Sequence, residues 1–262
     1  MAETDSAGYH VLARVYDRWQ DTYGRDFTAV ILPRLLTSIR RFRIPVSTIL
    51  DVGCGTGTLA LTMAGRGWKA WGVDASAEMV REAERKRNEA GLRVTFMRQD
   101  MRKLQMPRPV RLVTSMFDTL NHVSSAQELF ATFQGVHSAL LPGGYFMFDL
   151  NNEHCYATLW TQNEVIRHRD FILRLENSFD ASSGRARSLV TLTPRGGRAQ
   201  RTEVVEELLF PAAQIHALLE RAGFSVRLSE DFAFPDVPEV GLLKTWWVAH
   251  VPAGRAKKIP DI

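Results

Sequence analysis

The chain is poor in cysteine and has no long apolar run. Cys54 and Cys155 are the only cysteines among its 262 residues, too few for a disulfide framework, which favours a reducing compartment. The longest apolar stretches, such as Gly144–Phe148, fall far short of the roughly 18 residues that span a bilayer. The first ten residues are polar and partly acidic, without the basic start and apolar block of a secretory signal. We therefore expect a cytoplasmic protein that does not span a membrane.

The chain also lacks a block of like charge. It carries 33 basic and 29 acidic residues, a net charge of +4, and 27 of the basic residues are arginines scattered along the sequence. Because an arginine bias can reflect genome composition as easily as function, this charge makes nucleic acid an unlikely partner. A hydrophobic content of 45% excludes a mainly disordered chain, and the length suits one α/β domain with an insertion.

The first third of the chain changes from a helical to an alternating pattern. From Val11 to Arg43 apolar residues recur every three to four positions, which predicts a helical cap over residues 1–45. Pro33 should kink this region or open a second helix. Residues 46–151 then alternate short apolar runs with amphipathic segments. The predicted strands are 47–52, 70–73, 93–98, 110–116 and 145–150, and the predicted helices are 57–66, 77–90 and 125–141. Such alternation is typical of a doubly wound, mostly parallel sheet with helices on both faces.

The rhythm changes again after Asn151. Residues 152–210 hold alternating apolar runs and the turn signals Ser182–Gly184 and Pro194–Gly197, a pattern typical of antiparallel strands. A helix over 212–222 and strands at 225–229 and 242–251 are expected to complete the core in residues 211–252. We therefore predict a seven-stranded Rossmann-like sheet with an antiparallel last strand, a β-rich insertion and a disordered tail over residues 253–262.

A glycine-rich turn carries most of the functional information. In Asp51–Gly57 an apolar strand runs into three glycines at alternate positions, and a helix follows. Glycine permits positive φ and lets a ligand approach the backbone, while the helix N-terminus offers unpaired N–H groups. Asp74 ends the next strand, 21 positions after Gly53, a spacing that suits a carboxylate on ribose hydroxyls. The turn therefore predicts a nucleotide-like ligand at the carboxyl end of the sheet.

Two details favour a sulfonium cofactor over a dinucleotide. Dinucleotide sites place glycine at the sixth position of the turn, where this chain has Thr58. Asp51 lies just before the first glycine, and a buried acid there suits a ligand with a cationic amine. S-adenosylmethionine (SAM) carries such an amine, whereas NAD carries a pyrophosphate.

Four segments resemble, in order, the motifs of class I SAM-dependent methyltransferases. They are Asp51–Gly57, Gly72–Ser76 with Met79, Arg98–Met101 and Leu141–Gly144. The segment Ser115–His122, together with Tyr16-Asp17 and Tyr23, is similar to the small-molecule subgroup that includes sugar N-methyltransferases. The resemblance covers residues 45–150 well and the last helix and two strands more loosely.

The resemblance implies a set of cofactor contacts. The glycines and the Asp51 region would hold the methionine part of SAM, Asp74 the ribose, and Asp100 with the Met101 backbone the adenine amino edge. Met79 would pack on the adenine and Met116 or Phe117 would close over the donor sulfur, although core packing also explains these side chains. The implied cofactor-binding residues are Tyr16, Tyr23, Asp51, Gly53, Gly55, Gly57, Asp74, Ala75, Met79, Asp100, Met101, Met116 and Phe117.

Methyl transfer from a sulfonium is an in-line displacement that mainly needs alignment and the exclusion of water. Neither a metal nor a covalent intermediate is required, and His154-Cys155 has no partner pair at zinc spacing. A general base is needed only if the acceptor arrives protonated. His122 is the leading candidate, with a loop histidine in purely structural bonds as the alternative. Asn121 would orient the acceptor and Asp118 would attract a cationic one.

We therefore predict an enzyme that methylates an N or O atom of a small molecule and releases S-adenosylhomocysteine. An RNA or protein methyltransferase would call for a binding module or a target motif such as Asn-Pro-Pro-Tyr, where this chain has Phe117–Leu120. A non-catalytic SAM-binding protein is the other alternative. The insertion is expected to act as a lid over the acceptor pocket or as a contact in a homodimer.

Overall fold

The structure is a computed structural model of the chain, and it describes residues 9–22, 27–196, 199–233 and 241–253. Its centre is a seven-stranded sheet in the order β10-β11-β5-β4-β1-β2-β3. The strands are β1 (Thr48–Val52), β2 (Lys69–Asp74), β3 (Val94–Arg98), β4 (Val110–Ser115), β5 (Leu140–Asn151), β10 (Ser225–Phe232) and β11 (Lys244–His250). Strand β11 pairs antiparallel with both β5 and β10, and the other neighbouring strands pair parallel. The predicted sheet with its antiparallel last strand is confirmed.

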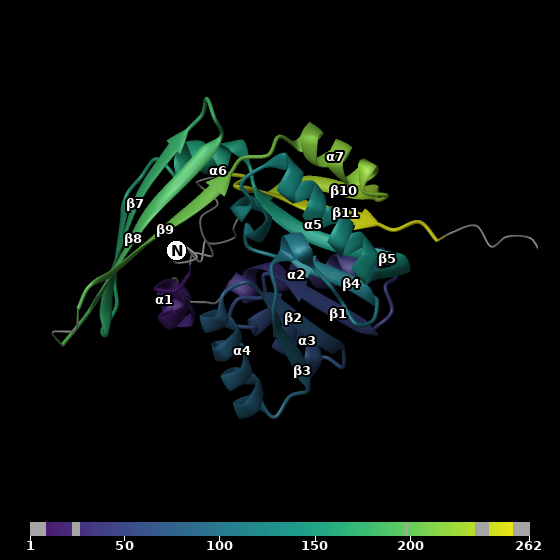
Figure 1. Cartoon of the computed structure of the whole chain (residues 1–262), viewed down its shortest axis with the longest axis horizontal. Coiled ribbons are helices and arrows are strands. Elements are labelled where there is room, and N and C mark those ends of the chain that lie inside the picture. The colour runs from purple at the N-terminus through teal and green to yellow at the C-terminus, as the bar shows by residue number, and fades with distance from the viewer. Residues whose placement is uncertain (1–8, 23–26, 197–198, 234–240, 254–262) are drawn as a thin grey trace, which may run out of the picture.

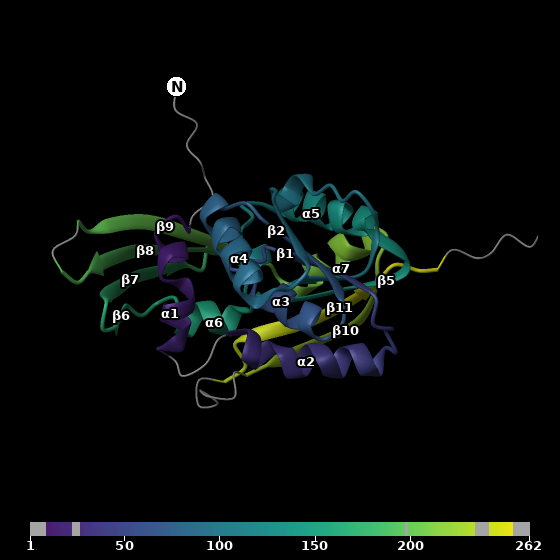
Figure 2. The ribbon, with the colours of Figure 1, turned by 90° about the horizontal axis from the view of Figure 1, so that it is seen from below.

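Helices cover both faces of this sheet (Figure 2). On one face lie α2 (Phe27–Arg41), α3 (Thr58–Gly65) and α4 (Ala77–Ala90), and on the other α5 (Ala126–Ala139) and α7 (Ala212–Arg221). Trp246 and Trp247 are adjacent on β11 and point to opposite faces. Both are buried, Trp246 in the cluster with α2 and Trp247 in the cluster with α5 and α7. Two apolar layers therefore sandwich the sheet.

Local signals fix both ends of α4. The Ser76 hydroxyl accepts a hydrogen bond from the Met79 N–H at 3.3 Å, and Gly91 ends α4 with a φ of 63°. The predicted helix over 77–90 is thus correct, because a cap and a left-handed glycine fix both ends. Pro33 lies inside α2, which begins at Phe27, so Pro33 does not open a helix.

The fifth strand is longer than predicted. It begins at Leu140, directly after α5, and runs through Pro142-Gly143-Gly144. The Gly143 N–H bonds to the Val251 carbonyl at 2.9 Å, and the Val251 N–H bonds to the Gly144 carbonyl at 2.9 Å. This pairing keeps an apparent turn signal within the strand. Helix α6 (Glu153–Thr158), capped by the Asn152 side chain, was not predicted either.

The insertion forms a second sheet beside the core (Figure 1). Its strands pair antiparallel in the order β6 (Glu164–Arg167), β7 (Phe171–Asp180), β8 (Arg185–Pro194) and β9 (Arg201–Leu208). The N-terminal segment, which contains η1 (Leu12–Arg14) and α1 (Tyr16–Asp21), packs its apolar residues on this sheet. The Glu203 carboxylate accepts the N–H groups of Val11 and Leu12 at 2.8 and 2.9 Å.

The same N-terminal segment also bonds to the core through Asp17. Asp17 bonds to Lys86 of α4 at 2.7 Å and to the hydroxyl of Thr56 at 2.6 Å. Segment 9–22 therefore joins the second sheet to the turn that follows β1. Among the helices that the structure describes, none combines the length and apolar character needed to cross a membrane.

Candidate active site

A cavity of about 1020 Å³ lies at the carboxyl edge of the parallel strands, where ligands bind in open α/β sheets. The turns that follow β1, β2, β3 and β4 form its floor. Tyr9 and Tyr16 line it from the N-terminal segment, and β8 and β9 line it from the second sheet. Three parts of the chain that are far apart in sequence thus line one cavity.

The three glycines of the turn after β1 differ in what a side chain at each position would contact. All have positive φ, between 52° and 77°. A Cβ on Gly53 would lie 2.2 Å from Thr119 Cγ2, and one on Gly57 2.6 Å from Phe96 Cζ. A Cβ on Gly55 would meet nothing closer than 4.0 Å, where Met79 and Tyr16 line the cavity. Gly53 and Gly57 therefore permit close packing, whereas Gly55 leaves the cavity open.

Two acids support this turn. The Asp74 carboxylate accepts the N–H groups of Gly55 and Ser76, both at 2.8 Å. Burial raises the pKa of Asp74, while these two N–H bonds act in the opposite direction. Asp51 is 4% exposed and accepts a hydrogen bond from the Thr114 hydroxyl at 2.7 Å. Burial raises the pKa of Asp51 to about 7.

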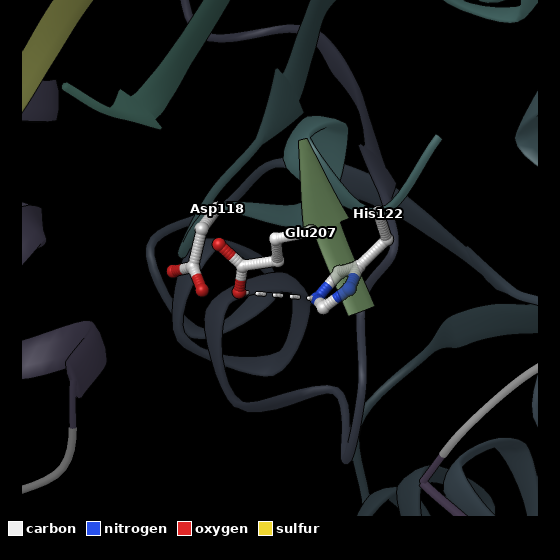
Figure 3. A group of neighbouring side chains, drawn as sticks. All are labelled: Asp118, His122 and Glu207. Carbon is white, nitrogen blue, oxygen red and sulfur yellow. Dashed lines mark ion pairs between the residues drawn. The ribbon is translucent and has the colours of Figure 1, made fainter. Parts of the chain in front are cut away.

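At the other end of the cavity His122 meets the second sheet (Figure 3). Its Nδ1 lies 3.0 Å from the Glu206 carbonyl oxygen. Because a carbonyl only accepts, Nδ1 carries a proton here, so Nε2 is the nitrogen that lacks one whenever the ring is neutral. Nε2 lies 3.1 Å from the Tyr9 hydroxyl and 3.9 Å from Glu207 Oε1. A base with a defined tautomer therefore faces the cavity.

Comparison with known proteins agrees with this geometry. The family model described as "Methyltransferase domain" matches residues 49–144. The dTDP-3-amino-3,4,6-trideoxy-alpha-D-glucopyranose N,N-dimethyltransferase of Streptomyces venezuelae is 28% identical over 194 residues, which cover 73% of each chain. The ubiquinone biosynthesis O-methyltransferase of Serratia proteamaculans is 29% identical over 166 residues, 60% of this chain and 67% of that protein. A SAM-dependent methyltransferase structure from Clostridium acetobutylicum superposes with a TM-score of 0.80 at 21% identity, covering 94% of this chain and all of that one.

Residues 49–144 form a methyltransferase domain. The methyltransferase cavity brings together most of the residues that the sequence implied. Those on its lining are Tyr16, Asp51, Gly53, Gly55, Asp74, Ala75, Met79, Asp100, Met101, Met116, Phe117 and His122. Gly57 packs against Phe96 and Ala83 instead, and Tyr23 lies outside the described residues.

Two features of the cavity lining fit SAM. Gly55 exposes bare backbone to the cavity, so that a ligand can approach it. The buried Asp51 offers a carboxyl for a cationic amine. Asp100 is less available to a ligand, because its carboxylate pairs with the Arg102 guanidinium at 2.7 Å. The same guanidinium also bonds to Glu128 at 2.7 Å. The hydrogen bond from Arg102 lowers the pKa of Asp100.

Asn121 does not line the methyltransferase cavity. It is fully buried, its amide N–H donates to the Leu208 carbonyl at 2.9 Å, and its oxygen accepts the Asn151 N–H at 3.0 Å. Its side chain ties η3 (Thr119–His122) to β5 and to the end of β9. Asn121 is therefore a structural residue of the site and not an acceptor contact.

Sequence reasoning missed Tyr9 and Glu207. Tyr9 lies 113 positions before His122, and Glu207 lies 85 positions after it. A glutamate in a predicted antiparallel strand gives no sign that its side chain is buried. The alternation of β9 is the one signal available, since Val205 and Glu207 share a face of the strand and both are buried.

Proposed function

We propose that this methyltransferase moves the methyl group of SAM to a nitrogen or oxygen atom of a small-molecule acceptor. One observation carries the proposal: a single cavity runs from the glycine turn to His122, and β8 and β9 line its far side. Its volume of about 1020 Å³ lies at the upper end of small-ligand pockets. A concave space of this size suits a cofactor with a small acceptor better than a folded RNA or protein.

The cofactor would occupy the glycine end. SAM supplies an activated methyl group on its sulfonium sulfur. Gly55 would lie against the methionine part, and Asp51 would pair with its amine. Asp74 would accept hydrogen bonds from the ribose hydroxyls, Met79 would pack on the adenine, and Phe117 would close over the sulfur. Phe117 is held in a left-handed conformation (φ 58°), where its N–H donates to the Asp149 carboxylate at 2.6 Å.

The acceptor would occupy the end formed by His122 and the second sheet. The unprotonated Nε2 of His122 is placed to take a proton from an acceptor that arrives protonated. Strands β6–β9 would act as a lid that excludes water. Glu203 of β9 connects this lid to the N-terminal segment through two hydrogen bonds. Named relatives support both acceptor atoms, since one is a sugar N,N-dimethyltransferase and another is an O-methyltransferase.

Turnover assays test the proposal. The enzyme is incubated with SAM and a library of small amines, alcohols and phenols, and S-adenosylhomocysteine is quantified. Acceptor-dependent product formation that falls at least about tenfold in His122→Asn is expected, because general-base catalysis typically contributes 10²–10⁴-fold. Methylation of tRNA or protein with no small-molecule turnover would contradict it.

A further inference from the structure

A second cavity, which we call the arginine groove, is separate from the methyltransferase cavity, and no described residue lines both. Its volume is about 950 Å³, and it lies where the N-terminal segment meets the β6–β7 turn, the end of β8 and the start of β9. Figure 1 and Figure 2 both show α1 beside this second sheet. We propose that the arginine groove binds a compact polyphosphate anion, such as pyrophosphate or the phosphate tail of a nucleotide.

The groove carries a large surplus of positive charge. Asp170 is the one acid among the described residues on its lining, and five arginines face it: Arg14, Arg18, Arg169, Arg195 and Arg201. Guanidinium groups do not lose their proton in proteins. The surplus in the groove is therefore as large as the net charge of +4 of the whole chain. Arginines that share one concave surface repel one another, and a bound anion relieves that repulsion.

The β6–β7 turn brings three of these arginines together. Asp170 Oδ2 lies 3.2 Å from Arg18 Nη1 and 3.7 Å from Arg169 Nε. The backbone N–H of Arg195 donates to the Asp170 carbonyl at 2.8 Å, and its Nε donates to the His168 carbonyl at 3.2 Å. One carboxylate oxygen thus already lies between two guanidiniums, an arrangement in which a phosphate oxygen also binds.

The other two arginines, Arg14 and Arg201, have free guanidinium groups. Both side chains are exposed, and neither guanidinium has a hydrogen-bond or ion-pair partner among the described residues. Arg14 lies four positions before Arg18, whose Nη2 donates to the Arg14 carbonyl at 2.8 Å. Arg201 begins β9 and lies opposite Leu192 of β8. Each fork of N–H donors is therefore available for a phosphate group, which a guanidinium can bind with two parallel hydrogen bonds.

The floor of the groove is apolar and firmly packed. Val15, Phe171 and Leu192 are buried in the cluster that joins the N-terminal segment to the second sheet. The Arg18 guanidinium lies 5.7 Å from the centroid of the Phe171 ring, a contact that restricts the position of Arg18. A packed floor with arginines around it reduces the ordering that a ligand would otherwise have to impose on the protein.

The surroundings of the groove favour a compact anion over an extended one. Beyond the groove, the second sheet mixes exposed arginines with exposed acids, such as Glu176 and Asp180 of β7 and Glu206 of β9. These acids would repel a nucleic acid or an anionic membrane that lay across the sheet. Two phosphoryl groups together carry about three to four negative charges near neutral pH. Such an anion matches the surplus of the groove better than a single carboxylate or sulfate does.

Isothermal calorimetry of the full chain with pyrophosphate at low ionic strength tests the site. We expect saturable binding that the double variant Arg14→Ala/Arg201→Ala weakens about 10- to 100-fold, the effect of losing charged hydrogen bonds. Because neither guanidinium has a partner in the described part of the chain, this variant should stay folded, which a thermal melt checks. The matched control is Arg108→Ala/Arg174→Ala, which removes two exposed arginines outside both cavities. It should change the affinity less than about twofold, since exposed charges at a distance are screened.

A second set of titrations identifies the source of the phosphate groups. In the presence of SAM, tighter binding of ADP than of pyrophosphate would assign the groove to a nucleotide. Equal affinities would assign it to free polyphosphate, and both results support the site.

Four results would overturn the proposal. The first is a wild type that shows no saturable pyrophosphate binding, and the second is a control variant that loses as much affinity as the groove variant. The third is displacement of pyrophosphate by SAM, which would place the anion in the methyltransferase cavity. The fourth is binding of heparin or of phosphatidylserine vesicles by a protein that does not bind pyrophosphate. Failure of the wild type to bind SAM would instead refute the proposed function and leave the arginine groove unaffected.

Discussion

The two ends of the cavity differ in the parts of the protein that form them. The glycine end consists mainly of backbone within residues 51–79, positioned by turns after two neighbouring strands. The His122 end is a network of groups from four distant segments, which meet where the second sheet packs beside the core. Backbone geometry is set by local sequence, whereas the network depends on the whole fold. Mutations at the two ends should therefore have different effects. Those in the side-chain network should lower stability, and those in the glycine turn should lower the affinity for SAM.

Lys244→Met should have the largest effect, and it should act on stability. The change removes the cation from the buried Asp149 carboxylate and from the half-buried Asp118 carboxylate, and breaking a buried pair typically costs about 3–5 kcal/mol. Urea unfolding measures this loss. Lys86→Met is the matched control, because the partner of Lys86, Asp17, is 37% exposed, and a surface pair is worth about 1 kcal/mol or less. Equal losses for the two variants would contradict the description of the Lys244 network.

Gly55→Val should act on affinity instead. Its side chain would point into the cavity between Met79 and Tyr16, and we expect SAM affinity to fall at least about 100-fold, since the bare backbone that the ligand needs is covered. Isothermal calorimetry measures the change. Gly67→Val carries the same left-handed strain, with φ 87° and nothing within 4 Å of its Cβ. If Gly67→Val weakens SAM binding as much, the loss comes from backbone strain and not from the cavity.

Asp74→Ala should weaken SAM binding by about 1–3 kcal/mol through lost charge-assisted hydrogen bonds. It also removes the acceptor for the Gly55 and Ser76 N–H groups, so part of the loss comes from a looser turn. Asp74→Asn keeps one acceptor oxygen and should lie between wild type and Asp74→Ala in a calorimetric titration. An unchanged affinity in Asp74→Ala would rule out the ribose contact.

The pH dependence of SAM binding tests Asp51. Its folded pKa of about 7 lies above the usual 3.8, so its contribution to stability is complete below about pH 4 and is lost as the pH rises through 7. Pairing with a cationic amine needs the ionised form. SAM affinity should therefore rise about tenfold per pH unit between pH 5.5 and 7, and Asp51→Asn should flatten this rise. A pH-independent affinity in the wild type would contradict the pairing.

The same contrast explains what the sequence could predict. The turn Asp51–Gly57, the cap at Ser76 and the acid Asp74 are local signals, and each lies where it was expected. The start of β5 was missed because Pro142-Gly143-Gly144 resembles a turn, and pairing with Val251 overrides that preference.

Most contacts at the His122 end of the cavity could not be predicted from the sequence. His122 was found through its place after β4, but its partners depend on the register of β9 against β8 and on the course of the N-terminal segment. Asn121 shows the converse. Its type and position suggested an acceptor contact, and only the structure shows both polar groups bonded to backbone.

A calorimetric titration of the wild-type enzyme with SAM, S-adenosylhomocysteine and NAD tests the central claim most directly. The account predicts that both adenosyl compounds bind at one site, because the glycine turn and Asp51 accept their amino-acid end, and that NAD gives no binding heat. Binding of NAD with the adenosyl compounds silent would contradict the account.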